Sequence, residues 1–355
     1  MLSFRSFSGP TLALVSAGLF GASTPLAKLL LGGGVDPWLL AGLLYLGTGV
    51  GLGLLHLIRR AGGRPPVEAP LGRGDLAWLA LVVLAGGVAG PILLMTGLSR
   101  TPASSAALLL NLEGLATMGI AWVIFKENVD RRLLLGAAAI LCGAVILSWQ
   151  GGPAGIGWGA IAITGACVAW GCDNNLTRKL SAADPVQIAM IKGLVAGAVN
   201  LTLALLQGAA MPSVPEVAAA GAVGFLGYGV SLVLFVLALR HLGSARTGAY
   251  FSMAPFVGTV VAVGLFHEPV TVQLLIAAAL MGLGLALHLA ERHDHEHVHE
   301  AMQHAHRHVH DEHHQHEHGP GDPAGEPHTH LHTHSPMTHR HPHYPDLHHR
   351  HGHAH

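Results

Sequence analysis

The sequence predicts an all-α membrane protein with ten transmembrane helices in two inverted five-helix repeats, followed by a disordered tail. Three observations lead to this fold class. Hydrophobic residues make up 51% of the 355 residues and charged residues only 11%, which is typical of a chain that crosses a bilayer many times. Ten apolar segments are each long enough to cross a hydrocarbon layer about 30 Å thick. The second five of these segments repeat the first five.

The ten expected spans are apolar stretches separated by short polar or Gly- and Pro-containing connections. They cover residues 10–31, 37–58, 75–97, 102–125, 132–149, 156–178, 186–207, 216–239, 244–266 and 271–290. The second and seventh spans both open with Asp-Pro, which is typical of an exposed helix start with proline in the first turn. The chain therefore divides into a first repeat at 1–150, a second repeat at 151–291 and a tail at 292–355.

The repeat is clearest between residues 101–127 and 242–268, which align with each other without a gap. The aligned segments share Ala121/Ala262, Phe125/Phe266 and Glu127/Glu268. The openings of the two halves also match, with Phe20-Gly21 opposite Trp170-Gly171. Because five spans is an odd number, the two repeats must cross the membrane in opposite directions.

The distribution of Lys and Arg sets the expected orientation. A cytoplasmic N-terminus leaves only Arg100 and Lys28 on the outer side. The inner side then collects Arg5, Arg59, Arg60, Arg64, Arg73, Lys126, Arg131, Arg132, Arg178, Lys179, Arg240, Arg246 and Arg292. Basic residues accumulate on the cytoplasmic side of membrane proteins. We therefore expect a multi-pass protein of the cytoplasmic (inner) membrane with both termini in the cytoplasm.

These features resemble the EamA family of the drug/metabolite transporter superfamily. The resemblance rests on the two five-helix halves, the aromatic-Gly pair that opens each half, and the Glu that closes each fourth helix, Glu127 and Glu268. It covers about residues 10–290 and excludes the tail. It implies a carrier with a central cavity formed by the first four helices of each half, peripheral fifth and tenth helices, and a structural role for the two Glu residues. Members of the family move metabolites, amino acids or drugs by alternating access.

Glu113 is the most informative residue inside the expected spans. It lies at the middle of the apolar stretch from Thr101 to Phe125, so its carboxylate cannot reach either membrane surface. Asn111 and Thr117 lie close by in the sequence. A carboxylate at this depth costs several kcal/mol and commonly marks a substrate or proton pathway. The alternative is a buried Glu that pairs with a cation or an amide and holds helices together.

A second polar group lies in the sixth span. Its members carry oxygen-bearing side chains that are suited to binding a cation or a polar solute: Asp173, Asn174, Asn175 and Thr177. The alternative is a polar helix end, because Arg178 and Lys179 follow. Lys192 lies two turns into the seventh span, where an unpaired ammonium is costly, so we expect Glu113 or Asp173 to be its partner.

The tail has a different composition. It holds 24 of the 28 His residues, most of them alternating with other residues. Neutral imidazole binds nickel, cobalt, zinc and copper, and His-x-His pairs chelate in many combinations. The prolines of the tail predict a disordered, polydentate chelator of a divalent metal such as Ni, Co or Zn. The candidate ligands are His293, His295, His297, His299, His304, His306, His308, His310, His328, His330, His332 and His334.

The sequence contains no set of residues that predicts an enzyme or a required cofactor, and it gives no reason to expect a nucleic-acid partner. The expected partners are the lipid bilayer and a small solute or metal ion, and a homodimer is left open. The leading functional hypothesis is secondary-active export of a divalent transition metal. The alternatives are an exporter of an organic metabolite, amino acid or drug with a metal-buffering or regulatory tail, and a membrane metal sensor that transports nothing.

Overall fold

The protein is described by a computed structural model. The described residues are 8–62, 71, 73–125, 131–149, 156–177, 180 and 184–289, together with the strand residues 294–299, 302–308, 328–334 and 337–342. The chain forms two compact units. The helical unit comprises Met1–Pro65 with Pro70–Leu289, and the tail unit comprises Pro66–Ala69 with Ala290–His355. The two repeats therefore pack together within one unit.

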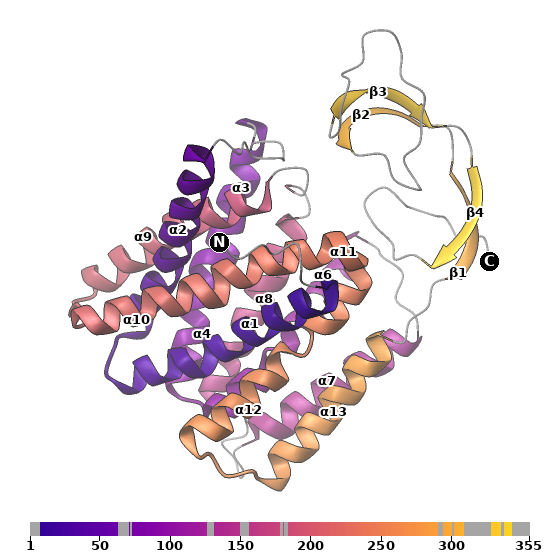
Figure 1. Cartoon of the computed structure of the whole chain (residues 1–355). Helices are drawn as coiled ribbons and strands as arrows, with labels where there is room; N and C mark the ends of the chain where they lie inside the picture. The colour runs from indigo at the N-terminus through magenta and orange to yellow at the C-terminus, as the bar shows by residue number, and fades with distance from the viewer. Residues whose placement is uncertain are drawn as a thin grey trace. The chain divides into compact units, whose positions relative to one another are not determined.

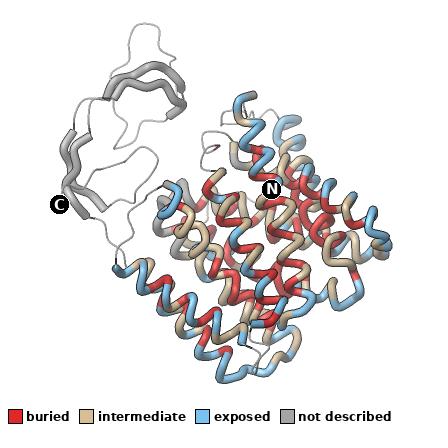
Figure 2. Tube along the Cα trace, turned by 180° about the vertical axis from the view of Figure 1, so that it is seen from behind, coloured by how far each residue is buried: buried red, intermediate tan, exposed pale blue. Residues whose placement is uncertain are grey.

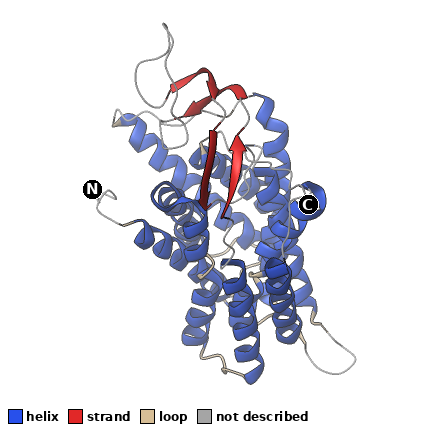
Figure 3. Ribbon diagram, turned by 90° about the vertical axis from the view of Figure 1, so that its right-hand side faces the viewer, coloured by secondary structure: helices blue, strands red, loops and turns tan. Residues whose placement is uncertain are grey.

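Every one of the ten expected spans is helical in the structure, which confirms the predicted all-α membrane fold (Figures 1 and 3). The first repeat contains α1 (Gly9–Gly32), α2 (Pro37–Ala61), η2 (Arg73–Asp75), α3 (Leu76–Val82), η3 (Val83–Ala89), α4 (Gly90–Ser99), α5 (Ala103–Leu109), α6 (Leu112–Phe125) and α7 (Arg131–Ser148). The second contains α8 (Trp158–Thr177), α9 (Pro185–Leu206), α10 (Val214–Gly224), η6 (Phe225–Val230), α11 (Ser231–Phe251), α12 (Ala254–Phe266) and α13 (Val272–Leu289). Within the described ranges, seven helical stretches are long and apolar enough to cross a membrane, and α12 and α13 are shorter apolar helices.

The two Asp-Pro pairs start helices as the sequence predicts. The Asp36 carboxylate accepts hydrogen bonds from the backbone N–H groups of Trp38 and Leu39 at the start of α2. Asp184 accepts one from Val186 at the start of α9. In both helices the proline occupies the first turn, where its missing N–H costs nothing.

The fourth segment of each repeat is broken near its middle. In the first repeat the break lies at Leu110–Asn111, between α5 and α6, and in the second it lies at Ser252–Met253, between α11 and α12. In the gap-free alignment of the two repeats these breaks differ by only one position. Asn111 donates its amide to the Leu108 carbonyl at 2.8 Å, and this local bond competes with a continuous helix. Pro255, in the first turn of α12, marks the second break.

The expected loop between the eighth and ninth spans, at residues 240–243, is wrong, because α11 continues through it to Phe251. In the first repeat, Pro102 separates α4 from α5. The aligned position in the second repeat is Gly243. A single glycine weakens a helix by only about 1 kcal/mol, whereas proline breaks it, so the two repeats differ here.

The third span of each repeat contains a π-helical segment, η3 in the first repeat and η6 in the second. The same alignment carries 84–89 onto 225–230, so the two segments occupy equivalent places. A π-helical turn inserts an extra residue into a helix and occurs frequently at functional sites. The inverted repeat thus extends to irregular backbone that composition alone does not predict.

The two repeats interlock through their first helices. Helix α1 packs against α11 and α12 of the second repeat, and α8 packs against α4 and α6 of the first. Gly21 and Gly171 lie at these crossings: a Cβ on Gly21 would come within 2.2 Å of the Ala254 carbonyl oxygen, and one on Gly171 within 2.8 Å of the Ala116 side chain. The buried residues lie along these inter-helix contacts (Figure 2). The aromatic-Gly pairs of the sequence therefore include the glycines that let the repeats approach.

In the described part of the tail unit, four short strands pair in two two-stranded antiparallel sheets. Strand β1 (Asp294–His299) pairs with β4 (Met337–Pro342), and β2 (Met302–His308) pairs with β3 (His328–His334). The disordered tail predicted above does not extend to these segments. The physical reason is that His at alternate positions has a period of two residues, which is also the period of a strand.

Candidate functional site

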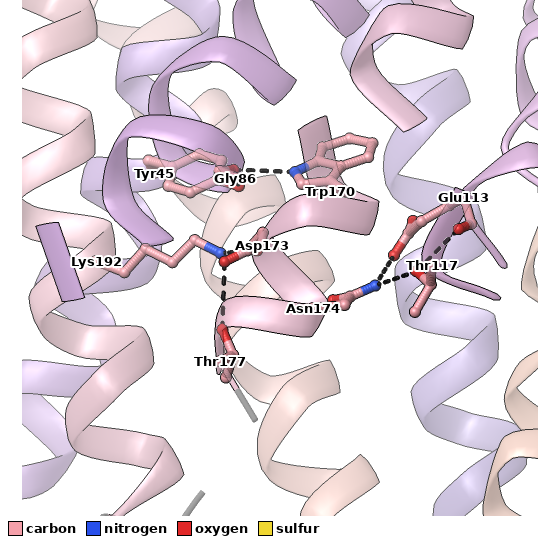
Figure 4. Close-up of polar contacts among 9 residues, drawn as sticks. All are labelled: Tyr45, Gly86, Glu113, Thr117, Trp170, Asp173, Asn174, Thr177 and Lys192. Atoms are coloured by element: carbon pink, nitrogen blue, oxygen red, sulfur yellow. Dashed lines mark hydrogen bonds and ion pairs between the residues drawn. The ribbon is translucent and has the colours of Figure 1, made fainter. Parts of the chain in front are cut away.

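Glu113 lies in the first turn of α6, directly after the helix break. Its carboxylate accepts a hydrogen bond from the Asn174 amide of α8 at 3.1 Å, and the same amide nitrogen donates to the Thr117 hydroxyl at 3.1 Å (Figure 4). Thr117 in turn donates to the backbone carbonyl of Glu113 at 2.9 Å. Among the described residues Glu113 has no ion-pair partner. Asn174 is exposed and lies in the last turn of α8.

Asp173 and Lys192 form an ion pair next to Glu113. Asp173 is buried, and its carboxylate accepts a hydrogen bond from the Lys192 ammonium of α9 and another from the Thr177 hydroxyl at 3.3 Å (Figure 4). The partner that the sequence leaves open for Lys192 is therefore Asp173. Because Asp173 and Asn174 are neighbours on α8, this helix supplies one partner of the ion pair and also binds the Glu113 carboxylate.

Two other candidates from the sequence lie elsewhere. Asn175 is buried and donates to the backbone carbonyls of Thr117 at 3.0 Å and Gly171 at 2.8 Å, so it joins α8 to α6. The Asn111 amide donates to the Leu108 carbonyl and lies 3.9 Å from the sulfur of Met281 on α13. Asn111 does not contact the Glu113 carboxylate, although the two residues are close in sequence, because the helix break separates them.

The sequence analysis missed the role of the π-helical segments in this site. The carbonyl of Gly86 in η3 accepts hydrogen bonds from the Tyr45 hydroxyl at 2.7 Å and from the Trp170 indole at 2.9 Å (Figure 4). The next carbonyl, that of Gly87, accepts one from the buried Asn200 amide at 2.9 Å. Side chains from α2, α8 and α9 thus bind carbonyls of η3. The only sign of this role in the sequence is that the two repeats carry Gly-containing stretches at equivalent positions.

Four aromatic side chains contributed by both repeats pack on one another. Tyr228 of η6 lies edge-on to Phe20 of α1, with ring centroids 5.7 Å apart, and 5.9 Å from the ring of Tyr45. Phe251, at the end of α11, lies 5.3 Å from Phe20. Tyr45 and Tyr228 are both within electrostatic range of Glu113. The site therefore combines one carboxylate without a cation, a neighbouring ion pair and a group of aromatic rings contributed by both repeats.

One end of the helical unit is held by contacts between the repeats. At the end where α4 stops and α5 begins, called here the α4–α5 end, Glu268 follows α12 and caps α5. Its carboxylate accepts hydrogen bonds from the backbone N–H groups of Ala103 at 2.7 Å and Ser104 at 3.0 Å, and from the Ser104 hydroxyl. Lys28 of α1 donates to the carbonyls of Leu98 and Thr101 at the same end. Glu268 thus has the structural role that the resemblance implies.

Helix α5 packs at the same end against α12 of the second repeat and α1 of the first. Glu127, the equivalent of Glu268, lies outside the described residues.

The candidate metal ligands fall into two groups. Among residues whose side chains the structure describes, no three His, Cys, Asp or Glu residues lie close enough to hold a metal ion. The three cysteines of the helical unit, Cys142, Cys167 and Cys172, are free. His293 and His310 lie outside the described residues. The other ten tail candidates lie on strands, namely His295, His297, His299, His304, His306, His308, His328, His330, His332 and His334.

A polytopic bundle of inverted helical repeats, with broken helices and charged groups at its centre, defines a membrane transporter. The chain belongs to the EamA-like transporter family, which it matches over residues 7–149 and again over 157–290. The two matches coincide with the two repeats recognised in the sequence.

Two relatives agree with this assignment, and one solved structure shares the fold. An uncharacterized transporter from Methanothermobacter thermautotrophicus is 29% identical over 281 residues, covering 75% of this chain and 81% of the relative. The uncharacterized transporter YyaM of Bacillus subtilis is 24% identical over 298 residues, covering 80% of this chain and 90% of YyaM. A crystal structure with a TM-score of 0.58 covers 80% of this chain and 96% of its own, at 22% identity, which supports the fold alone.

Proposed function

We propose that the helical unit is a secondary-active carrier for a small organic solute with one positively charged group, and that Glu113 binds that group. The observation that carries the proposal is the unequal pairing of two neighbouring carboxylates. Asp173 has Lys192 as a partner, whereas Glu113 accepts only the neutral Asn174 amide. When all three groups are ionised, one negative charge stays uncompensated. An ammonium group of a solute, or a proton, supplies the missing positive charge.

The aromatic rings near Glu113 favour an organic solute. Tyr45 and Tyr228 interact electrostatically with Glu113, and their rings pack with those of Phe20 and Phe251 from both repeats. A cation over an aromatic face gains about 0.5–2 kcal/mol, and the rings also accept the apolar body of the solute. This combination is the alternative to a metal substrate that the sequence analysis names.

Asn174 connects solute binding to the packing of α8. Its amide holds the Glu113 carboxylate at 3.1 Å. An arriving ammonium group competes for the same carboxylate oxygen, and a charge-assisted bond is roughly twice as strong as a neutral one. Release of Asn174 removes a contact between α6 and α8 beside the Asp173–Lys192 pair. Solute binding thereby biases the position of a helix that joins the two repeats.

Contacts at one end of the helical unit fit this proposal. Glu268 and Lys28 hold the α4–α5 end together. With both termini in the cytoplasm, as the basic residues predict, this end faces outward. We infer a transport cycle with an outward-closed state, in which a solute enters from the cytoplasm and leaves by export.

A divalent transition metal such as Ni, Co or Zn is the second candidate substrate. The His-rich tail favours it, because imidazoles attached to the carrier raise the local metal concentration. In the helical unit the metal would use oxygen atoms of Glu113, Asp173 and Asn174.

The test is uptake into inside-out vesicles that contain the full chain or its Glu113→Gln variant. The substrates are a panel of radiolabelled organic amines and amino acids and the ions Ni, Co and Zn. We expect energy-dependent uptake of at least one amine and its loss in Glu113→Gln, because an amide neither pairs with an ammonium nor exchanges a proton. Glu216→Gln is the matched control, because Glu216 is only partly buried and hydrogen-bonds Ser213 at the start of its own helix.

Each result decides between the candidates. Uptake of a metal but of no amine selects the second candidate. Full activity of Glu113→Gln, at an unchanged level of inserted protein, refutes the assigned role of Glu113 and leaves this carboxylate as a structural residue.

A further inference from the structure

Helix α12 ends at a residue with an unusual backbone conformation. His267, directly after Phe266, has φ 51° and ψ 37°, which is the left-handed region. Among the described residues it is the only non-glycine residue with positive φ, a property it shares with Gly34 and Gly208. In this region the Cβ of an L-residue comes too close to the following carbonyl oxygen, so glycine is the usual residue at such a helix end. His267 therefore holds a conformation that its own side chain opposes.

The left-handed turn sets the direction of the next residue, Glu268. A helical residue at position 267 would carry the chain on along α12, whereas a left-handed one turns the chain away from the helix axis. The Glu268 carboxylate then accepts its three hydrogen bonds from Ala103 and Ser104 at the start of α5. A further bond joins the same two helices, from the Thr259 hydroxyl of α12 to the Ser104 carbonyl at 3.1 Å. The bonds of Glu268 that close the α4–α5 end thus depend on the backbone of one strained residue.

The strain at His267 is held by its neighbours in the chain. Its side chain is exposed, so packing around the imidazole does not fix the conformation. A residue stays in a sparsely populated backbone region only when the surrounding structure imposes it. The two constraints on His267 are helix α12 before it and the bonded Glu268 after it. Release of Glu268 from α5 removes one of these constraints and lets the backbone at position 267 relax.

We propose that His267 is a positioning residue, which aims Glu268 at α5 when the α4–α5 end is closed and leaves the left-handed region when this end opens. The proposal rests on the transport cycle proposed above, in which this end opens to release the solute. The strain at His267 opposes the bonds of Glu268, so the closed state is less stable than those bonds alone would make it. A carrier needs such a balance, because an end that never opens stops transport.

The test measures how often the α4–α5 end opens. Ala106 is fully buried in α5, which packs against α12 and α1. An Ala106→Cys reporter therefore reacts with a maleimide only when this packing opens. The protein is the full chain in detergent, with Cys142, Cys167 and Cys172 replaced by Ala.

The variants of His267 differ in their tolerance of the left-handed region. We expect His267→Gly to lower the labelling rate by about threefold, because glycine removes the steric cost but gives back part of that gain through its greater freedom. His267→Asn should also lower the rate, because asparagine tolerates this region. His267→Val should raise it by about threefold or more, since a β-branched side chain is an outlier there. The matched control places Gly and Val at Gln207, an exposed residue that ends α9 with an ordinary φ of -85°, and neither change should alter the rate.

A second comparison separates a positioning role from an ordinary helix end. In a Glu268→Gln background the bonds that impose the left-handed turn are weakened, so the labelling rates of His267→Gly and His267→Val should converge to within about twofold. The same spread of rates in both backgrounds, or equal rates for all His267 variants with Glu268 present, would overturn the proposal. So would a reporter that stays unreactive in every variant, Glu268→Gln included. Because no solute enters the measurement, these outcomes are independent of the test of Glu113.

Discussion

Replacing Glu268 by glutamine should loosen the α4–α5 end of the helical unit. The carboxylate of Glu268 accepts hydrogen bonds from two backbone N–H groups and one hydroxyl of Ala103 and Ser104, 165 and 164 positions away in the sequence. Glutamine has nearly the same shape but lacks the charge, and its amide NH₂ group faces donors rather than acceptors. The change therefore weakens a contact that joins the two repeats without altering either helix.

The size of the effect follows from the bonds that are lost. A hydrogen bond to a charged group contributes about 1.5–3 kcal/mol, and loss of a helix cap costs about 0.5–2 kcal/mol. Taking about 2 kcal/mol for the closed state, and about 1.4 kcal/mol for each factor of ten, the ratio of closed to open molecules falls about 30-fold. Opening of this end exposes residues that are buried in the closed state. When opening and closing are fast relative to chemical labelling, the labelling rate of such a residue therefore rises by the same factor.

Cysteine accessibility measures this equilibrium. Ala27 is fully buried in α1, next to Lys28, so an Ala27→Cys reporter in a background without other cysteines reacts only when the α4–α5 end opens. We expect Glu268→Gln to raise its labelling rate by a membrane-impermeant maleimide by the factor derived above. Glu216→Gln is the control, because Glu216 makes similar bonds to Ser213 but inside one repeat. An unchanged rate in Glu268→Gln, or an equal rise in Glu216→Gln, would refute the reasoning.

Two further predictions concern the ion pair and the orientation of the chain. Lys192→Met should lower the free energy of unfolding in detergent by roughly 3 kcal/mol, because it leaves the buried Asp173 carboxylate without its cation. Combining Lys192→Met with Asp173→Asn should recover most of the lost free energy of unfolding. If the single and double variants are equally destabilised, the ion pair itself contributes nothing to stability. Reporter fusions at Gly152 and after Arg292 should lie in opposite compartments, the second in the cytoplasm, given the basic residues on one side. The same compartment for both would contradict the inverted repeat.

The sequence by itself determined most of the spans, the repeat and the family. These follow from local properties: the apolar length that a bilayer requires, the aspartates at 36 and 184 that cap the helices after them, and the self-similarity of the two halves. It also singled out Glu113, a carboxylate in the middle of an apolar stretch, and a polar group on the sixth span. Each of these can be read from one segment at a time, because a helix in lipid satisfies its own backbone.

Only the tertiary structure decided which of these polar groups meet. The choice of Asp173 over Glu113 as partner of Lys192 depends on how α8 and α9 are rotated and where they cross. Asn111 faces α13 because the helix breaks next to it, although its sequence position points to Glu113. The carbonyl of Gly86 gathers Tyr45 and Trp170 because a π-helical turn directs it toward α2 and α8. In each case the deciding contact joins residues from different helices, and helix rotation and crossing are set by the packing of the whole bundle, which no single segment contains.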